Sequence, residues 1–209
     1  MLSYKHGYHA GNHADVMKHI IMLYLYNLEK KVNNSISYID THSGNGIYKY
    51  ISKYMDKNKE YKEGIKKIQN YKGNNILIKN YLSTISKITG KNNFYPGSPI
   101  FISSIANKKD KLFFCELHKN EYELLKKNLN KFTNTKILNA DGFNFIFNKI
   151  NKDKNYFVFI DPSSLYWEEA VSTVTTFIEL SVTVDICPIL TPSTNKESPS
   201  VLDVAPFIE

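Results

Sequence analysis

The apolar residues near the start of the chain recur with the period of an α-helix. Between residues 15 and 30 they fall on two neighbouring stripes of one helical face, formed by Val16, Ile20 and Leu23 and by Met17, Ile21, Tyr24 and Leu28. Asp15 opens this stretch and Glu29-Lys30-Lys31 closes it, and both ends suit the helix dipole. The pattern predicts a helix over residues 15–30, preceded by an arm over residues 1–14 that is rich in His, Gly and Tyr.

From residue 35 onward, short apolar runs alternate with stretches of helical periodicity. The apolar runs predict four strands, over residues 35–39, 111–116, 137–138 and 156–160. The periodic stretches predict helices over residues 100–107, 120–131 and 143–150. Because strands that alternate with helices are typical of a parallel sheet with right-handed crossovers, we expect an α/β fold.

Residues 50–95 have a different amino-acid composition. They are rich in Lys, Tyr, Ile and Asn, with apolar residues at helical spacing that Gly73-Asn74-Asn75 interrupts. We expect a small helical insertion of at least two helices here, outside the central sheet. The sequence Tyr95-Pro96-Gly97-Ser98-Pro99 follows it and is interpreted as a turn that leads into the next helix.

Acidic residues end all four predicted strands: Asp40, Glu116, Asp141 and Asp161. The carboxyl ends of parallel strands lie at one edge of a sheet, where open α/β sheets bind their ligands. Each acid alone equally suits a helix N-cap or a solvated strand end. Together with Gly44 and Gly46, which allow close approach of the backbone to a ligand, they favour a ligand that contains adenosine. The spacing Asp-x-x-x-Gly-x-Gly is typical of S-adenosylmethionine-dependent methyltransferases, although a strand followed by a glycine turn is common.

The chemistry of three of these acids can be specified further. Glu116, at the end of the second strand, could accept both hydroxyls of a ribose. Asp141 could accept the exocyclic amine of an adenine. Asp161-Pro162 lies where adenine-N6 methyltransferases carry an acid-Pro-Pro-aromatic motif. The lone pair of an adenine amine is delocalised into the ring, so an acid that accepts its hydrogens makes the nitrogen a better nucleophile and can take up the proton.

The composition bounds the class of protein. The 209 residues suffice for one domain with a small insertion, and the two cysteines form no disulfide framework. We find no run long enough to span a membrane and no signal-peptide pattern, and we expect a cytoplasmic protein. All 27 basic residues are lysine and the net charge is +7, which suits an anionic partner such as nucleic acid. A bias toward Lys and Asn would produce the same charge.

The composition changes sharply after Pro162. Residues 1–162 contain 26 lysines and 13 acidic residues, whereas residues 163–209 contain one lysine and seven acidic residues. Asparagine falls from 22 residues to one across the same boundary. We interpret residues 163–209 as a divergent tail, frameshifted or disordered, in which the β-prone stretch 171–184 could supply one replacement strand.

Several motifs, in the same order, resemble the RlmJ family. They are the arm Met-Leu-Ser-Tyr-Lys-His-Gly-Tyr-His-Ala-Gly-Asn-His, the loop Tyr-Ile-Asp-Thr-His-Ser-Gly-Asn-Gly-Ile-Tyr (38–48), Tyr-Pro-Gly-Ser-Pro (95–99), Glu-Leu-His (116–118) and Ala-Asp-Gly-Phe (140–143). This resemblance covers about residues 1–162. It implies a Rossmann-like class I methyltransferase sheet and an enzyme that methylates N6 of an adenine in 23S ribosomal RNA with S-adenosylmethionine.

The resemblance also implies roles for individual residues. The cofactor pocket would be lined by His19, His42, Ser98, Glu116, Asp141 and Gly142. Asp161 would be the catalytic acid, and Tyr4 in the arm would contact the RNA. The four histidines of the first nineteen residues could alternatively suggest a metal, but no cysteine or ligand spacing supports one, so we expect no metal. We expect a monomer that binds no membrane.

The chain departs from the family directly after Asp161. It reads Asp161-Pro162-Ser163-Ser164-Leu165-Tyr166, without the second proline and with the aromatic residue displaced by two positions. The sequence therefore predicts that the last strands of the sheet are missing or replaced. Three hypotheses follow: an active methyltransferase of ribosomal RNA, an impaired relative that only binds cofactor or RNA, and an unrelated small-molecule methyltransferase. The lysine-rich surface and the arm argue against the third.

Overall fold

The computed structural model describes residues 6–52, 55–150, 156–161 and 184–186. The prediction for Tyr4 lies outside these residues. So does the prediction of a divergent tail, apart from the three residues 184–186. Within the described part of the chain, no helix combines the length and the apolar character that crossing a membrane requires.

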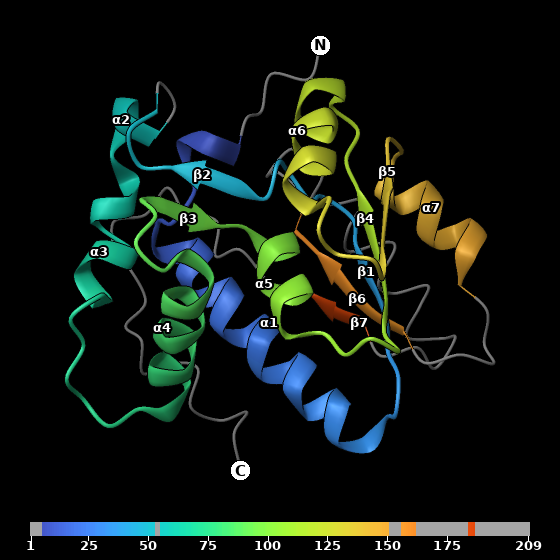
Figure 1. Cartoon of the computed structure of the whole chain (residues 1–209), viewed down its shortest axis with the longest axis horizontal. Helices are drawn as coiled ribbons and strands as arrows, with labels where there is room; N and C mark the ends of the chain where they lie inside the picture. The colour runs from blue at the N-terminus through green and yellow to red at the C-terminus, as the bar shows by residue number, and fades with distance from the viewer. Residues whose placement is uncertain (1–5, 53–54, 151–155, 162–183, 187–209) are drawn as a thin grey trace, which may run out of the picture.

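A parallel sheet of five strands forms the centre of the molecule, in the order β5-β4-β1-β6-β7 (Figure 1). The strands are β1 (Ser37–Asp40), β4 (Lys111–Cys115), β5 (Thr135–Leu138), β6 (Tyr156–Ile160) and β7 (Val184–Ile186). The register places Ile39 of β1 between Phe113 of β4 and Val158 of β6. The predicted α/β fold with a parallel sheet is confirmed, and β7 extends the sheet by pairing with β6.

Both faces of the sheet are apolar, because successive side chains of these largely apolar strands point to opposite faces. One face carries Tyr38, Leu112, Phe114, Phe157 and Phe159 and is covered by α1 (His13–Val32), α5 (Ser98–Ile105) and α6 (Lys119–Leu129). The other carries Ile39, Phe113, Val158 and Ile160 and packs on α7 (Gly142–Lys149). Figure 1 shows α1 and α5 on one side of the strands and α7 on the other.

The helix α1 begins at His13, two residues before the predicted start at position 15, and Asn12 is its N-cap. The side chain of Asn12 accepts a hydrogen bond from the Asp15 N–H, which is the N-cap interaction that a helix start requires. Residues ahead of it form a single 3-10 turn, η1 (His6–Tyr8). At the far end, Tyr26 is fully buried and its hydroxyl donates to Asp110, a carboxylate that also accepts the Ile36 N–H.

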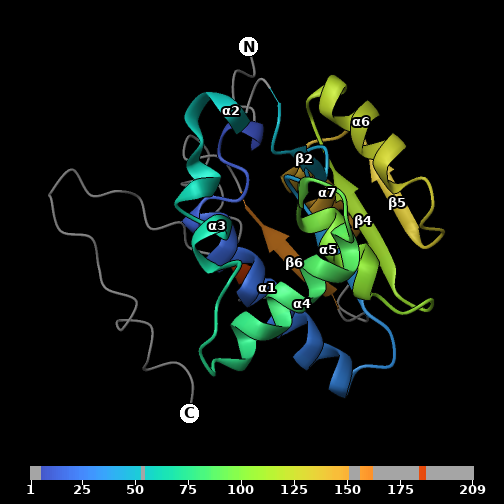
Figure 2. The same ribbon diagram turned by 60° about the vertical axis from the view of Figure 1, so that its left-hand side comes forward.

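The stretch between β1 and β4 contains helices and two strands, β2 (Ile47–Lys49) and β3 (Phe94–Pro96), that the sequence did not predict. The helical elements are α2 (Met55–Asn58), η2 (Glu60–Lys62), α3 (Ile65–Ile68) and α4 (Ile76–Thr89), and Asn75 caps α4 at the predicted interruption. Figure 2 shows α2 and α3 beside the start of α1, away from β4 and β5. That this stretch is an insertion remains a prediction.

The predicted turn at residues 95–99 is wrong in its first half. Phe94–Pro96 is a strand, β3, paired antiparallel with β2 (Ile47–Lys49) so that Tyr48 lies opposite Tyr95. Pro96 and Gly97 are strong turn signals, and the pairing partner lies far away in the sequence, where local patterns cannot detect it. The helix α5 then starts at Ser98.

Candidate active site

The junction of β1 and β6 is the topological switch point of the sheet. From β1 the chain moves outward to β4 and β5, and it then returns to β6 on the opposite side of β1. In open α/β sheets, ligands bind beyond the carboxyl ends of the strands at such a point. Asp40 ends β1, and Asp161 directly follows β6. The backbone N–H of Thr41 donates to the Phe159 carbonyl at 3.1 Å, which holds the two strand ends together.

Asp161 forms a buried ion pair with Lys18 of α1. Lys18 Nζ lies 2.6 Å from Asp161 Oδ2 and 3.2 Å from Asp15 Oδ1. The side chain of Lys18 is 7% exposed and that of Asp161 is 11% exposed. The second oxygen of Asp161, Oδ1, is buried and has no hydrogen-bond partner among the described residues. One oxygen of this carboxylate is therefore held in place by a cation, and the other is available as an acceptor.

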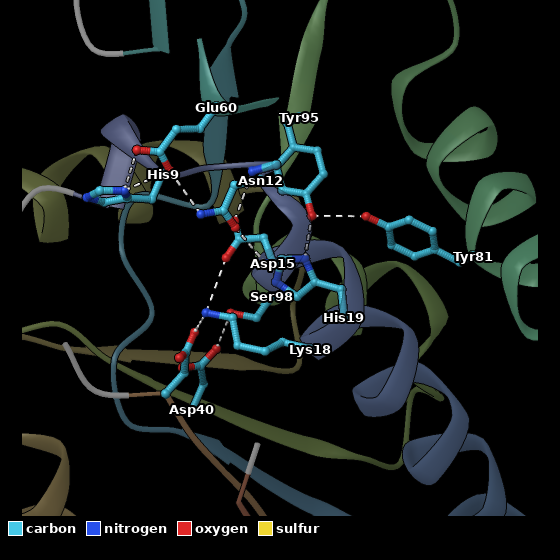
Figure 3. A network of polar contacts seen from close by, with 12 residues as sticks. His9, Asn12, Asp15, Lys18, His19, Asp40, Glu60, Tyr81, Tyr95 and Ser98 are labelled. Carbon is cyan, nitrogen blue, oxygen red and sulfur yellow. Dashed lines mark hydrogen bonds and ion pairs between the residues drawn. The ribbon is translucent and has the colours of Figure 1, made fainter. Parts of the chain in front are cut away.

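Asp40, at the end of β1, is fully buried. The Ser98 hydroxyl donates to its Oδ2 at 2.7 Å (Figure 3). The His42 N–H donates to its Oδ1 at 3.2 Å. Burial raises the pKa of Asp40 to about 7, the Ser98 and His42 hydrogen bonds oppose the rise, and the negative charge of Asp161 adds to it. The hydroxyl of Ser98, which was predicted to line the cofactor pocket, therefore contacts Asp40 at the end of β1.

The loop after β1 requires glycine at two positions. Gly44 and Gly46 have φ angles of +60° and +78°, which residues with a side chain adopt rarely. A Cβ atom at Gly44 would also overlap the Tyr48 hydroxyl. The Gly44 N–H donates to Glu116 Oε2 at 2.8 Å, so the glycine loop and the end of β4 are joined directly.

Glu116 lies just beyond β4 with both carboxylate oxygens engaged by backbone donors. Oε2 accepts the Gly44 N–H, and Oε1 accepts the His118 N–H at 2.7 Å. Burial raises the pKa of Glu116, and these two hydrogen bonds oppose the rise. Because each carboxylate oxygen has two lone pairs, the bonds fix the orientation of the group and leave it able to accept the two hydroxyls of a ribose.

His42, Asp141 and Gly142 meet at the start of α7. Asp141 caps this helix by accepting the Asn144 N–H at 2.9 Å. A Cβ atom at Gly142 would overlap the carbonyl oxygen of Thr41, so the β1 loop and α7 are in close contact. The His42 ring lies edge-on to Phe143, with 5.2 Å between the ring centroids. Burial lowers the pKa of His42, and the charges of Asp161 and Asp141 oppose this.

His19 follows Lys18 in α1 and is 3% exposed. Its Nδ1 lies 2.7 Å from the Tyr95 hydroxyl, which is in turn 3.0 Å from the Tyr81 hydroxyl of α4 (Figure 3). Its ring also packs against Phe101, with 4.9 Å between centroids. The described contacts of His19 therefore point toward β3, α4 and α5.

A family model described as "Ribosomal RNA large subunit methyltransferase D, RlmJ" matches residues 33–183 of this chain. The chain belongs to the RlmJ family. The match includes β1, the glycine loop, β4, β5 and β6, and it continues past Pro162 to residue 183, beyond the last of the motifs that indicated the resemblance.

Relatives in the family include two named "Ribosomal RNA large subunit methyltransferase J". The protein of Escherichia coli (strain K12) is 33% identical over 165 residues, and that of Haemophilus influenzae is 38% identical over 167 residues. Both alignments cover 78% of this chain but only 59% of the relative, so the chain spans about three fifths of their length. A crystal structure of a Legionella pneumophila protein is similar with a TM-score of 0.75 and 31% identity, covering 85% of this chain and 67% of that one.

Among the residues that sequence reasoning singled out, the structure gathers Glu116, Asp141 and Asp161 at the carboxyl edge of the sheet. The sequence analysis missed Lys18 and Asp15, whose i,i+3 spacing on the predicted helix was the available signal. Within the described part of the chain, no group of three or more His, Cys, Asp and Glu side chains could hold a metal ion.

Proposed function

We propose that this member of the RlmJ family transfers a methyl group from S-adenosylmethionine to N6 of an adenine in 23S ribosomal RNA. The observation that carries the proposal is the Asp161 carboxylate at the switch point of the sheet. One oxygen is held by Lys18 and the other is a buried acceptor. The names of the Escherichia coli and Haemophilus influenzae relatives supply the class of substrate, a ribosomal RNA.

The residues at this edge fit S-adenosylmethionine. Gly44 and Gly142 are positions where a Cβ atom would overlap Tyr48 and Thr41, so the glycines allow close packing of the backbone at this edge. Two backbone donors orient Glu116, which could accept the hydroxyls of a ribose. One carboxylate oxygen of Asp141 caps α7, and the other could accept an adenine amine. When bound, the cofactor supplies a methyl group on a sulfonium sulfur, which takes the electrons of the breaking S–C bond.

Asp161 would act on the adenine amine. Its Oδ1 accepts a hydrogen of the N6 amine, which draws the nitrogen lone pair out of conjugation with the ring while the N–C bond forms. The nitrogen then loses a proton, which the carboxylate can accept. Lys18 offsets the cost of burying the Asp161 and Asp15 carboxylates and fixes the oxygen that it contacts. Tyr4 of the arm would stack on the extruded base or its neighbours.

Residues 1–162 would form the catalytic domain, with the helices between β2 and β3 as an insertion. Because its proposed substrate is ribosomal RNA, we expect the protein to act in the cytoplasm, as a monomer. The lysines of the surface would attract the RNA backbone through phosphate contacts.

The alternative is a relative that binds cofactor or RNA without transferring the methyl group. It is favoured by Ser163 and Ser164, which stand where the family has a second proline and an aromatic residue. Radiolabelled methyl transfer to 23S ribosomal RNA that lacks the modification distinguishes the two, with cofactor binding measured calorimetrically on the same sample. Transfer supports the enzyme, whereas cofactor binding without transfer supports the alternative.

A further inference from the structure

A chain of polar contacts joins the helical segment between β2 and β3 to the Lys18–Asp161 pair. Its outer member is Glu60 of η2, which contacts two residues of the arm. His9 Nδ1 lies 3.0 Å from Glu60 Oε1 and 2.9 Å from Oε2, and Asn12 Nδ2 donates to Oε2 at 3.0 Å (Figure 3). Asn58 Nδ2 lies 3.3 Å from Oε1 within the same segment.

Asn12 carries this contact into α1. While its amide nitrogen donates to Glu60, its amide oxygen accepts the Asp15 N–H and caps the helix. The side chain of Asp15 turns back to accept the Gly11 N–H at 2.9 Å through Oδ2 and contacts Lys18 through Oδ1. Lys18 in turn reaches Asp161. Each link is a direct contact, so a displacement of Asn12 moves the groups that hold the carboxylate.

A second contact brings the same two segments together next to Glu60. The Ile65 N–H donates to the Gly11 carbonyl at 2.9 Å. A Cβ atom at Gly64 would overlap the backbone of Gly11 and Asn12, so the two backbones touch. The electrostatics favour an ionised Glu60. Although its partial burial raises the pKa, hydrogen bonds from Asn12 and His9 outweigh this and lower the pKa below its ordinary value.

We propose that Glu60 is a positioning residue for the methyl transfer. It anchors the arm at His9 and Asn12. Through the N-cap of α1 it holds Lys18 in contact with Asp161. This role rests on the proposed function, because Asp161 matters for catalysis only if the chain transfers a methyl group. The Glu60 side chain is 33% exposed, and such partly exposed ion pairs contribute little to global stability, so a purely structural role would leave the rate of the folded enzyme unchanged.

The test compares Glu60→Ala with Glu63→Ala, a matched control in the same segment whose ion pair is with Lys67. Asn12→Ser keeps a capping oxygen but removes the amide that reaches Glu60. We expect Glu60→Ala and Asn12→Ser each to lower kcat for methyl transfer to ribosomal RNA by about tenfold or more, since small displacements of catalytic groups have effects of this order. Cofactor affinity should stay within about twofold, and the double variant should lose no more than either single one.

Hydrogen exchange at the Gly11 and Asp15 amides, measured on the same samples, tests the anchor without activity. Faster exchange in Glu60→Ala but not in Glu63→Ala, together with the fall in kcat, supports the proposal. Unchanged exchange overturns the anchor, and faster exchange with unchanged kcat overturns the positioning role. Absence of transfer by the wild-type chain removes the proposed function and this catalytic role together, whereas the exchange result still decides whether Glu60 anchors the arm.

Discussion

Lys18 and Asp161 are separated by most of the described chain, yet their charged groups lie 2.6 Å apart. Lys18 reaches this position from the second turn of α1, and Asp161 from the end of β6, because α1 packs against the face of the sheet next to β6. Asp15 lies 3.2 Å from the same ammonium, so one cation faces two buried carboxylates.

Removal of the Lys18 charge should destabilise the protein. In Lys18→Met the side chain keeps its approximate length, but the Asp15 and Asp161 carboxylates lose their shared cation inside the protein. Breaking a buried ion pair in this way costs about 3–5 kcal/mol, which urea unfolding would measure. Lys67→Met, at an exposed ion pair, is the control and should change the free energy of unfolding by less than about 1 kcal/mol. Equal effects of the two variants would contradict the described network.

Substitution of Asp161 should separate chemistry from cofactor binding. Asp161→Asn keeps the shape of the side chain but loses the charge and the capacity to take up the amine proton. We expect methyl transfer to fall by about 10²–10⁴-fold, the usual contribution of a positioned acid or base, with cofactor affinity changed little. Asp161→Ala should behave in the same way. If either variant keeps wild-type transfer, the assignment of Asp161 as the catalytic acid is wrong.

Asp40 should make the stability of the protein depend on pH. Its pKa of about 7 in the folded protein exceeds the ordinary value of an aspartate in the unfolded chain. The folded state therefore retains a proton that the unfolded state has released. The contribution of Asp40 is fully present below about pH 4, the ordinary aspartate pKa, and is lost as the pH rises through 7.

The variant Asp40→Asn isolates this effect, because its amide oxygen still accepts the Ser98 hydroxyl. Between pH 5 and pH 7 the wild-type free energy of unfolding should fall more steeply than that of Asp40→Asn, by up to about 1.4 kcal/mol per pH unit. Urea unfolding at several pH values gives both slopes. Parallel slopes would show that Asp40 ionises in the folded state as it does in the unfolded chain.

Gly142→Ala, at the start of α7, should be more harmful than a glycine substitution at the C-cap of α4. The added Cβ atom at position 142 would overlap the Thr41 backbone, so the β1 loop and α7 must separate. We expect a loss of about 2 kcal/mol or more in the free energy of unfolding and weaker cofactor binding. The control is Gly90→Ala, where the φ angle is +54° but no atom lies within 4 Å of the added Cβ. It should cost about 1 kcal/mol and leave cofactor binding unchanged.

Tyr4→Ala tests the predicted role of the arm. Tyr4 lies outside the described residues, and its assignment rests on the family resemblance. We expect the KM for ribosomal RNA to rise by about tenfold, the loss of one base-stacking contact, while calorimetric cofactor affinity changes little. Equal losses in RNA use and cofactor binding would argue that the arm acts on the cofactor pocket instead.

Local patterns were sufficient for most of the central sheet. The predicted strand over 156–160 agrees with β6, and the predicted helices over 120–131 and 143–150 agree with α6 and α7 to within two residues at each end. The strand is a continuous apolar run, and the helices repeat their apolar residues with the helical period, so no distant contact was needed to predict them. The alternation of these elements then implied parallel strands, and parallel strands brought the acidic ends Glu116, Asp141 and Asp161 to one edge.

What the sequence alone determined is therefore the order of the elements, the parallel sheet and the edge that carries the acids, because short-range periodicity and chain connectivity encode them. The tertiary structure decided which groups meet at that edge. The pairing of β2 with β3, the Lys18–Asp161 contact and the Ser98–Asp40 hydrogen bond each join residues that lie far apart in the chain. Such contacts depend on how helices pack on the sheet, and packing involves residue pairs whose separation leaves no periodic signal in the sequence.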